Sequence, residues 1–351
     1  MTHALLVLED GTVFAGEKLG AAGQTVGELI VTTAMTGYQE LLTSGAYQGA
    51  VVLFTTPHVG NVGMNSEDGP GPLRAGGVVL REHPRLHSNW RAQRSFEDDL
   101  LEAGTVGITG VDTRALARRA RSGMRVGIFT GEVGPVSELV QAVRATPSGA
   151  DTLIARATTS EPYRVGEGRP HVAIIDLGLG RELAETVRRT GAPALVLPAS
   201  AAYADVAACG AERALFSGGP GNPADATTAL GLAREIVSAG MPVLGFGLGH
   251  QILARALGFA TEPLPRAHHG ANHPVQARGS GHVDITSHTH SYTVNFADSP
   301  DVEITHVSLN DGSVEGFVAR GKPVAGLQFH PELGAGPSDA HHLLDSFLKD
   351  A

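Results

Sequence analysis

The chain has 351 residues, 42% of them hydrophobic, which is enough length for two domains and enough apolar surface to bury their cores. Acidic residues outnumber basic ones by 36 to 26, and the net charge of −10 argues against a surface for nucleic acid or anionic membranes. The single cysteine, Cys209, excludes a disulfide framework and any metal site with several cysteine ligands. We find no apolar run of the ~20 residues that a membrane span needs and no signal-peptide pattern, so we expect a cytoplasmic protein.

In residues 1–150, short runs of β-branched residues alternate with residues that favour turns. Ala4–Leu8 and Val13-Phe14 flank Asp10-Gly11, a pattern that predicts a β-hairpin. Further strands are expected at Leu29–Thr33, Val51–Thr55, Val78–Arg81 and Val106–Thr109, and helices around Glu40–Leu42 and at Thr113–Arg121. This part of the chain therefore predicts a β-rich α/β domain.

The pattern changes after residue 150. Residues 151–170 are rich in Ser, Thr, Gly and charged side chains, and we interpret them as a linker. In residues 171–351, apolar runs first alternate with helical segments. The expected strands are His171–Leu177, Ala194–Pro198, Ala214–Ser217 and Pro242–Phe246, and the expected helices are Arg181–Arg189, Ala204–Ala208, Ala226–Ala239 and Gln251–Leu257. Unbroken apolar strands between helices predict a parallel sheet that is covered on both faces.

The last third of the chain alternates faster and predicts antiparallel strands followed by a closing helix at His341–Lys349. These strands are expected at Val283–Thr286, Ser291–Val294, Glu303–Val307, Val314–Arg320 and Val324–Gln328.

A glycine-rich segment, Gly245–Gln251, lies directly between an expected strand and an expected helix. A sharp turn of this kind lifts its central residue above the carboxyl end of a sheet and points helix amides at any charge that develops there. In hydrolases the central residue is the nucleophile. Here it is Gly247, which has no side chain, and a glycine-rich turn without a function is the alternative interpretation.

Two other loops carry groups that could assist chemistry. The glycines of Ser217–Pro223 leave backbone N–H groups unshielded and could form an anion-binding nest, or they could belong to an ordinary loop. His330 lies two residues before Glu332 at an expected strand end, so the carboxylate could orient the imidazole as a general base. An exposed histidine and glutamate in a loop would be the simpler explanation.

Histidines gather in one region of the second half. They are His268, His269, His273, His282, His288 and His290. No carboxylate or cysteine stands at ligand spacing from them, and no pair with i, i+4 spacing lies in an expected helix. We therefore predict no metal site.

Taken in chain order, the three loops resemble those of the triad class of glutamine amidotransferases. In that class the sharp turn between strand and helix, called the elbow, has the pattern Gly-x-Cys-x-Gly-x-Gln. A Gly-Pro-Gly loop precedes that elbow and a His-Pro-Glu sequence follows it. The chain as a whole is similar to the small subunit of carbamoyl phosphate synthetase. The segments that carry this resemblance are Leu6–Gly11, Met35–Glu40, Pro57–Asn61, Ser88–Arg91, Val111–Arg114, His268–Pro274 and Gly336–Ala340. It implies a domain that docks on a large subunit, followed by a class I amidotransferase domain with a flavodoxin-like parallel sheet.

The resemblance also implies an activity. In that family a cysteine thiolate attacks the side-chain amide of L-glutamine, and the released ammonia passes to the large subunit. Carbamoyl phosphate is made there for arginine and pyrimidine synthesis. The small chain needs no cofactor of its own, because ATP and Mg²⁺ belong to the large subunit.

Residue by residue, the resemblance makes His330 the general base and Glu332 the group that orients it. Gly219 and Leu248 would supply the amides of the oxyanion hole. Gly221 and Gln251 would contact glutamine.

The chain departs from the family pattern in the same pocket. Gly247 stands where the family has its nucleophilic cysteine. The other pocket positions are Thr289 in place of Asn, Ser291 in place of Gly, Ala46 in place of a glutamine-binding Ser, and Tyr292, which keeps the aromatic character. Cys209 is no replacement, because it precedes the strand Ala214–Phe216 and so belongs to the opposite end of the sheet.

We therefore expect glutaminase activity to be absent or vestigial, and three interpretations stay open. The chain could dock on a large subunit that uses free ammonia. It could be a binding module with a non-catalytic pocket for an amide or a carboxylate. It could also be an enzyme that acts on another substrate through His330 and Glu332.

Overall fold

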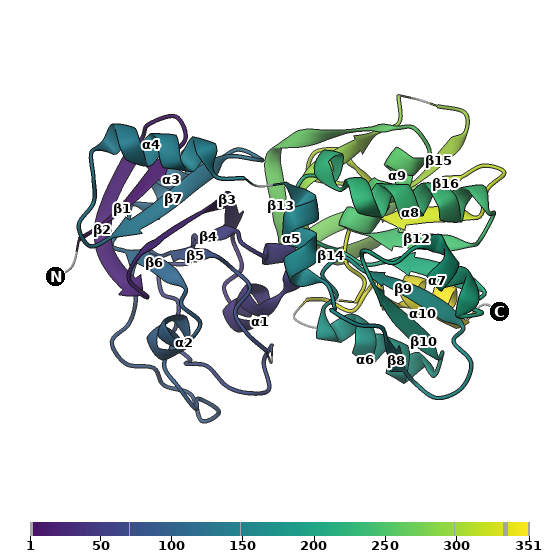
Figure 1. Ribbon diagram of the computed structural model, residues 1–351, viewed down its shortest axis with the longest axis horizontal. Helices are drawn as coiled ribbons and strands as arrows, with labels where there is room; N and C mark the ends of the chain where they lie inside the picture. Colours follow the sequence, from purple (N-terminus) through teal and green to yellow (C-terminus); the bar gives the residue numbers. More distant parts are fainter. Residues whose placement is uncertain (1–2, 70, 148, 298, 333–335, 350–351) are drawn as a thin grey trace. The chain divides into compact units, whose positions relative to one another are not determined.

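The computed structural model describes residues 3–69, 71–147, 149–297, 299–332 and 336–349 (Figure 1). The chain divides into two compact units. The first comprises Met1–Ser148 and Pro265–His269, and the second comprises Gly149–Leu264 and Gly270–Ala351. Among the described residues, no helix has both the length and the apolar character needed to cross a membrane.

The first unit is built around a closed β-barrel with the strand order β1-β2-β6-β5-β4-β3-β7. Its strands are β1 (His3–Leu8), β2 (Val13–Gly20), β3 (Gln24–Thr32), β4 (Val51–Phe54), β5 (Gly77–Val79), β6 (Val106–Thr109) and β7 (Arg125–Thr130). Its helices are α1 (Tyr38–Thr43), the 3-10 helix η1 (Gly45–Tyr47), α2 (Phe96–Glu102), α3 (Thr113–Arg119) and α4 (Val136–Ala145).

The predicted hairpin between β1 and β2 is confirmed, with Val7 opposite Val13. The amide of Thr12 donates to the Asp10 carboxylate at 2.8 Å, and Gly11 takes a φ of +91°, a conformation that glycine adopts without strain. Helix α4 was not predicted from the sequence. This helix lies against β1 and β7, and buries Leu139 and Val143 beside Phe129 (Figure 1).

The second unit is built around a 10-stranded sheet with the order β14-β13-β15-β16-β17-β12-β11-β9-β10-β8, and only residues 265–269 of β13 are assigned to the first unit. Its strands are β8 (Tyr163–Val165), β9 (Val172–Asp176), β10 (Ala194–Pro198), β11 (Arg213–Phe216), β12 (Val243–Phe246), β13 (Ala260–Ala277), β14 (Val283–Asn295), β15 (Val302–Ser308), β16 (Val314–Ala319) and β17 (Val324–Leu327). Its helices are α5 (Ala150–Ala157), α6 (Arg181–Thr190), α7 (Tyr203–Ala208), the 3-10 helix η2 (Pro223–Asp225), α8 (Thr227–Ser238), α9 (Leu248–Ala256) and α10 (His341–Lys349).

The central strands β10, β9, β11 and β12 run parallel, as predicted. Strand β17 was expected among the antiparallel strands; it pairs antiparallel with β16, but it also pairs parallel with β12 and so extends the parallel part of the sheet. Alternate residues of β9 belong to different cores: Ala173 and Ile175 pack in one cluster with α7, α8 and α9, whereas Ile174 packs in another with α6 and α10. Because successive side chains of a strand point to opposite faces, helices cover both faces of this sheet. The predicted α/β architecture, with a β-rich first domain, is confirmed.

The expected linker at residues 151–170 instead holds α5 and β8, and both elements belong to the second unit. Ile154 and Ala157 of α5 are buried, and the Thr158 hydroxyl donates to the carbonyl of Asp176 at 2.6 Å. Thr158, one of the polar residues of this segment, thus fixes the turn after α5 to the end of β9.

The long strands β13 and β14 differ from the predicted elements. No strand was predicted at β13, which contains Pro, Gly and His, and two short strands were predicted where β14 is continuous. The polar residues Ser287 and His288 lie between the two expected strands and are buried within one continuous strand.

Candidate active site

Three loops of the second unit meet because they follow neighbouring parallel strands. Residue Phe216 at the end of β11 pairs with Gly245 of β12, and Phe246 of β12 pairs with Leu327 of β17. The carboxyl ends of parallel strands lie at one edge of a sheet, where α/β proteins bind their ligands. The loops that begin at Ser217, Gly247 and Gln328 therefore converge at that edge.

Gly247 forms the expected sharp turn between β12 and α9. Its backbone has φ +47° and ψ −111°, in the left-handed range that favours glycine. As the N-cap of α9, Gly247 is followed by the amide of Leu248 in the first helical turn, where amides lack an intrahelical acceptor. A Cβ atom at Gly247 would lie only 2.9 Å from Nε2 of His330. The elbow therefore exists, and its apex faces the imidazole.

His330 and Glu332 form a buried pair. Nδ1 of His330 donates to Oε1 of Glu332 across 2.8 Å, and the two residues are 6% and 7% exposed. The backbone amide of His330 donates to the Ser287 carbonyl at 2.9 Å, which fixes the loop against β14. The alternative of an exposed pair in a loop is wrong, and the carboxylate orients the ring as predicted.

Thr289 of β14 contacts the other ring nitrogen of His330. Its Oγ1 lies 2.5 Å from Nε2. Because Nδ1 donates its hydrogen to Glu332, Nε2 accepts the hydrogen of the threonine hydroxyl. A hydroxyl, an imidazole and a carboxylate thus stand in sequence, which is the arrangement of a nucleophile with its base and orienting group.

The loop after β11 packs directly on this pair. The Ser217 hydroxyl accepts a hydrogen bond from the Leu177 amide at 2.9 Å and donates to the Gly218 carbonyl at 2.9 Å. A Cβ at Gly218 would come within 2.4 Å of Cε1 of His330, and one at Gly219 within 2.5 Å of the Leu177 carbonyl oxygen. Only glycine allows so close an approach of the loop to the imidazole.

Three other predicted site residues belong to the second unit: Gln251, Ser291 and Gly221. Gln251 is 2% exposed, and its Nε2 donates to the Tyr292 carbonyl at 2.8 Å and to Oε1 of Gln328 at 3.0 Å. Both amide hydrogens of Gln251 therefore hold α9 to β14 and to the residue that follows β17, rather than facing a ligand. Ser291 is buried, and Gly221 packs against α5, where a Cβ would meet Cα of Ala150 at 2.9 Å.

Two further residues named from the sequence belong to other elements. Ala46 belongs to η1 of the first unit. Cys209 ends α7, and its thiol donates to the Val206 carbonyl at 3.0 Å. Because Cys209 precedes β11, it lies at the amino end of the strands, which confirms that it is no substitute for a residue at the elbow.

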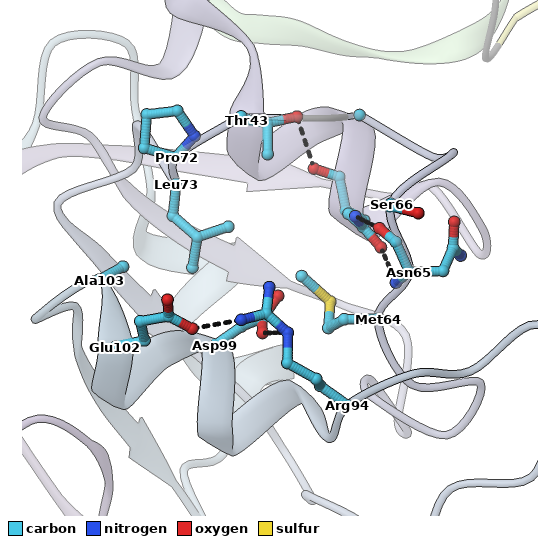
Figure 2. A pocket seen from close by; sticks show the side chains of 13 residues that line it. Thr43, Met64, Asn65, Ser66, Pro72, Leu73, Arg94, Asp99, Glu102 and Ala103 are labelled. Carbon is cyan, nitrogen blue, oxygen red and sulfur yellow. Dashed lines mark hydrogen bonds and ion pairs between the residues drawn. The ribbon is translucent and has the colours of Figure 1, made fainter.

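The first unit contains a pocket of about 460 Å³ between α1 and α2 (Figure 2). Arg94 is the cation in its wall, and its guanidinium pairs with Asp99 at 2.9 Å and also with Glu102. Burial raises the pKa of Asp99, and Arg94 counteracts that shift. The charges of this pocket are thus already paired, and its wall contains none of the predicted site residues.

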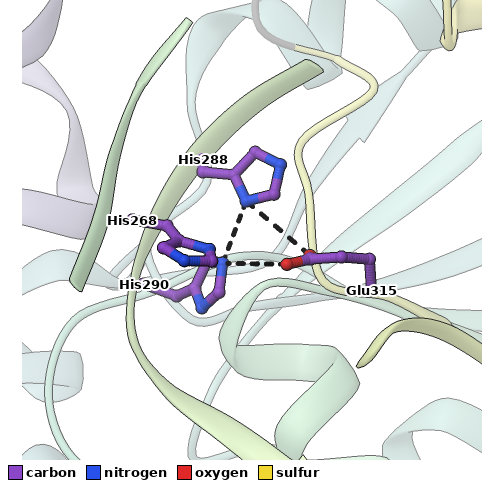
Figure 3. A group of neighbouring side chains, drawn as sticks. All are labelled: His268, His288, His290 and Glu315. Carbon is purple, nitrogen blue, oxygen red and sulfur yellow. Dashed lines mark hydrogen bonds and ion pairs between the residues drawn. The ribbon is translucent and has the colours of Figure 1, made fainter. Parts of the chain in front are cut away.

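The histidine-rich region holds an arrangement that the sequence analysis missed. Glu315 of β16 places its carboxylate 3.7 Å from Nδ1 of His288 and 3.9 Å from Nε2 of His290 (Figure 3). Asp284 is four residues from His288 in sequence, but the carboxylate that reaches both histidines is Glu315, which the fold supplies from another strand. Only the alternation of His288 and His290, which puts both on one face of a strand, hinted at this cluster.

Comparison with known proteins extends over both units. The family "Carbamoyl-phosphate synthase small chain, CPSase domain" matches residues 6–129, and the family "Glutamine amidotransferase class-I" matches residues 173–350. A carbamoyl phosphate synthase small chain from Streptomyces coelicolor is 44% identical over 99% of this chain and 95% of its own length. Proteins of the same name from Streptomyces avermitilis and Nitratidesulfovibrio vulgaris are 43% and 39% identical, each over 98% of this chain and over 95% and 97% of their own lengths. The chain belongs to the family of carbamoyl phosphate synthase small chains.

Proposed function

We propose that this chain is the docking partner of a carbamoyl phosphate synthase large chain, and that its own amidotransferase site has lost glutamine hydrolysis. The observation that carries this proposal is Gly247 at the apex of the elbow, beside His330. No side chain at the apex can form a thioester with glutamine.

The size of the expected defect follows from the chemistry. Removing the nucleophile of a catalytic triad lowers the rate by a factor on the order of 10⁴ to 10⁶. A water molecule in place of the thiol would need His330 as its base, and Nε2 of that ring already accepts the Thr289 hydroxyl. Ammonia for the large chain would then come from solution rather than from L-glutamine.

The preserved architecture supports the docking role. Both family domains are present in their order, and the relatives match this chain along nearly its full length. We assign ATP and Mg²⁺ to the large chain, the complex to the cytoplasm, and its product to the arginine and pyrimidine pathways. This chain requires no cofactor for that role.

The test is reconstitution with the large chain from the same organism. We expect the two chains to copurify, and carbamoyl phosphate to form with ammonium chloride but not with glutamine. The His330→Ala variant is the control, and its ammonium-dependent rate should equal that of the unmodified complex. Glutamine turnover on the order of one per second would overturn the loss of hydrolysis, and failure to copurify would overturn the docking role.

Two observations favour secondary candidates. The buried His330–Glu332 pair beside the helix amides of α9 could hold an amide or carboxylate without turnover, and calorimetry with glutamine tests for such a regulatory pocket. The Thr289 hydroxyl beside Nε2 of His330 could attack another acyl substrate. A fluorophosphonate adduct that maps to Thr289 would identify a hydrolase of that kind.

A further inference from the structure

We propose that His288, His290 and Glu315 bind a first-row divalent metal ion of the Zn²⁺ type, which joins β14 to β16. All three residues belong to the second unit and are buried, with exposed fractions of 1%, 5% and 0%. Figure 3 shows both rings and the carboxylate turned toward one another. His268, which is also drawn there, belongs to the first unit.

The outer hydrogen bonds of the two rings determine which inner nitrogens carry hydrogen. Nδ1 of His290 lies 2.9 Å from the Tyr292 carbonyl oxygen, which can only accept, so Nδ1 carries the hydrogen. In the neutral ring, Nε2 of His290 therefore carries no hydrogen, and this is the atom that lies nearest Nδ1 of His288 and the Glu315 carboxylate.

The same reasoning applies to His288 through one more step. The Thr286 hydroxyl donates its only hydrogen to the His273 carbonyl at 2.9 Å. It must therefore accept the hydrogen bond from Nε2 of His288, 2.7 Å away. This leaves Nδ1 of His288 as a lone pair that also faces the cluster.

Three electron-pair donors thus converge in a buried space. Nδ1 of His288 and Nε2 of His290 are 3.0 Å apart, a hydrogen-bonding distance for which neither neutral ring supplies a hydrogen. The Glu315 oxygens lie 3.7 and 3.9 Å from these nitrogens. The two imidazole nitrogens and the carboxylate are buried and lie at spacings that a single metal ion can bridge.

A divalent ion fits this arrangement. Two ligand atoms at about 2.1 Å from Zn²⁺ and at the tetrahedral angle lie about 3.4 Å apart, close to the three spacings observed. Ligating histidines commonly donate their other N–H to a carbonyl or similar acceptor, as both rings do here. Imidazole ligands and near-complete burial favour Zn²⁺ and its neighbours over Mg²⁺ or Ca²⁺, which prefer oxygen ligands and keep bound water.

The competing explanation is an extra proton. If one ring were an imidazolium, it could donate across the 3.0 Å gap with Glu315 as its counter-ion. The proton would satisfy the hydrogen bond without any metal. Metal-binding measurements separate these two cases.

The site would also position the neighbouring residue Thr289. It lies between the two histidines on β14, so its side chain points to the opposite face and reaches His330. An ion that fixes the backbone of His288 and His290 would therefore fix the hydroxyl that Nε2 of His330 accepts.

The experiment titrates Zn²⁺ into the full chain after it has been stripped with a chelator, and follows binding by calorimetry, metal content and thermal midpoint. We expect one ion per chain and a higher midpoint when Zn²⁺ is bound. His288→Gln and Glu315→Gln, which keep polar side chains of similar reach, should each weaken binding ~100-fold or more. His282→Gln is the matched control, because His282 is an exposed histidine just before β14 and should leave the affinity unchanged.

The absence of stoichiometric Zn²⁺ on the unmodified chain would overturn the proposal in favour of the shared proton. Equal affinity in the His288 and Glu315 variants would overturn it as well, because the ion would then sit elsewhere. If these variants fail to fold, the X-ray absorption spectrum of Zn²⁺ on the unmodified chain decides. Two imidazoles with oxygen support the site, and any sulfur ligand or a single imidazole overturns it.

Discussion

Gly247 and Thr289 together determine the surroundings of the His330 ring. With no side chain at residue 247, the imidazole lies where a Cβ would be only 2.9 Å from Nε2, and the threonine hydroxyl occupies the hydrogen-bonding direction of that atom. A thiol placed at the elbow would have to displace either the ring or the hydroxyl. The elbow and the His330 ring are therefore not arranged to accept a thiol.

We expect Gly247→Cys alone to restore less than ~1% of the glutamine hydrolysis that a triad amidotransferase shows, measured as glutamate release. The double variant Gly247→Cys/Thr289→Asn should be at least ~10-fold faster, because it removes the hydroxyl that competes for Nε2 of His330. The control is Thr289→Asn alone, which should stay inactive. Full recovery with the single cysteine would contradict the argument and mean that the other departures in the pocket are harmless.

At the scale of the elements, Asp176 holds the end of β9 to two neighbouring segments. Its Oδ1 accepts hydrogen bonds from the amides of Gly178 at 2.9 Å and Leu179 at 2.5 Å, and its Oδ2 accepts from the amide of Thr159 at 2.7 Å. The side chain is buried, so these amides would lack a replacement acceptor from water. Asp176 thus links the turn after α5 to the loop before α6.

Asp176→Ala should lower the free energy of unfolding by about 2–4 kcal/mol, because charged hydrogen bonds are lost and buried amides lose their acceptor. Asp176→Asn retains one acceptor oxygen and should lower it less. Denaturant unfolding measures both, and Asp225→Ala, at an exposed carboxylate of the same unit, should change the free energy by less than about 0.5 kcal/mol. An effect of Asp176→Ala as small as that of the control would refute the proposed link.

For the molecule as a whole, buried histidines set how stability depends on pH. His250 of α9 is fully buried, with its ring 5.0 Å from that of Phe317. Burial lowers the pKa of His250 to about 3. Burial also lowers the pKa of His306. Both rings are therefore neutral in the folded chain and become protonated more readily when it unfolds.

The sign of the pH effect follows directly. The unfolded chain binds a proton at His250 near pH 6.5, and the folded chain does so only near its lowered pKa. The contribution of neutral, buried His250 to the free energy of unfolding is therefore fully present above pH 6.5. It is lost as the pH falls below 6.5, at up to about 1.4 kcal/mol per pH unit. We expect His250→Gln to flatten the decline in unfolding free energy between pH 6.5 and 4. His342→Gln, at an exposed histidine, is the control and should follow the unmodified chain, and an unchanged slope in His250→Gln would disprove the assignment.

Helices and strands were predictable where the hydrophobic pattern of the local sequence matches the burial of those residues in the fold. The hairpin at Asp10-Gly11 and the apolar run of β9 follow from turn chemistry and from continuous hydrophobic residues. The α4 helix and β13 were missed because contacts with distant strands decide whether such segments are buried. For the same reason β14 was predicted as two shorter strands, because the polarity of its middle residues does not reveal that they are buried.

The sequence by itself determined the family resemblance, the order of the two domains, the turn at Gly247 and the absence of a thiol there, because these depend on residue identity and on neighbours along the chain. Only the tertiary structure decided the contact of Thr289 with His330 and the approach of Glu315 to His288. These partners are separated in sequence and lie on strands that are brought together by the sheet. Spacing along the chain carries no record of which side chains will share a buried space.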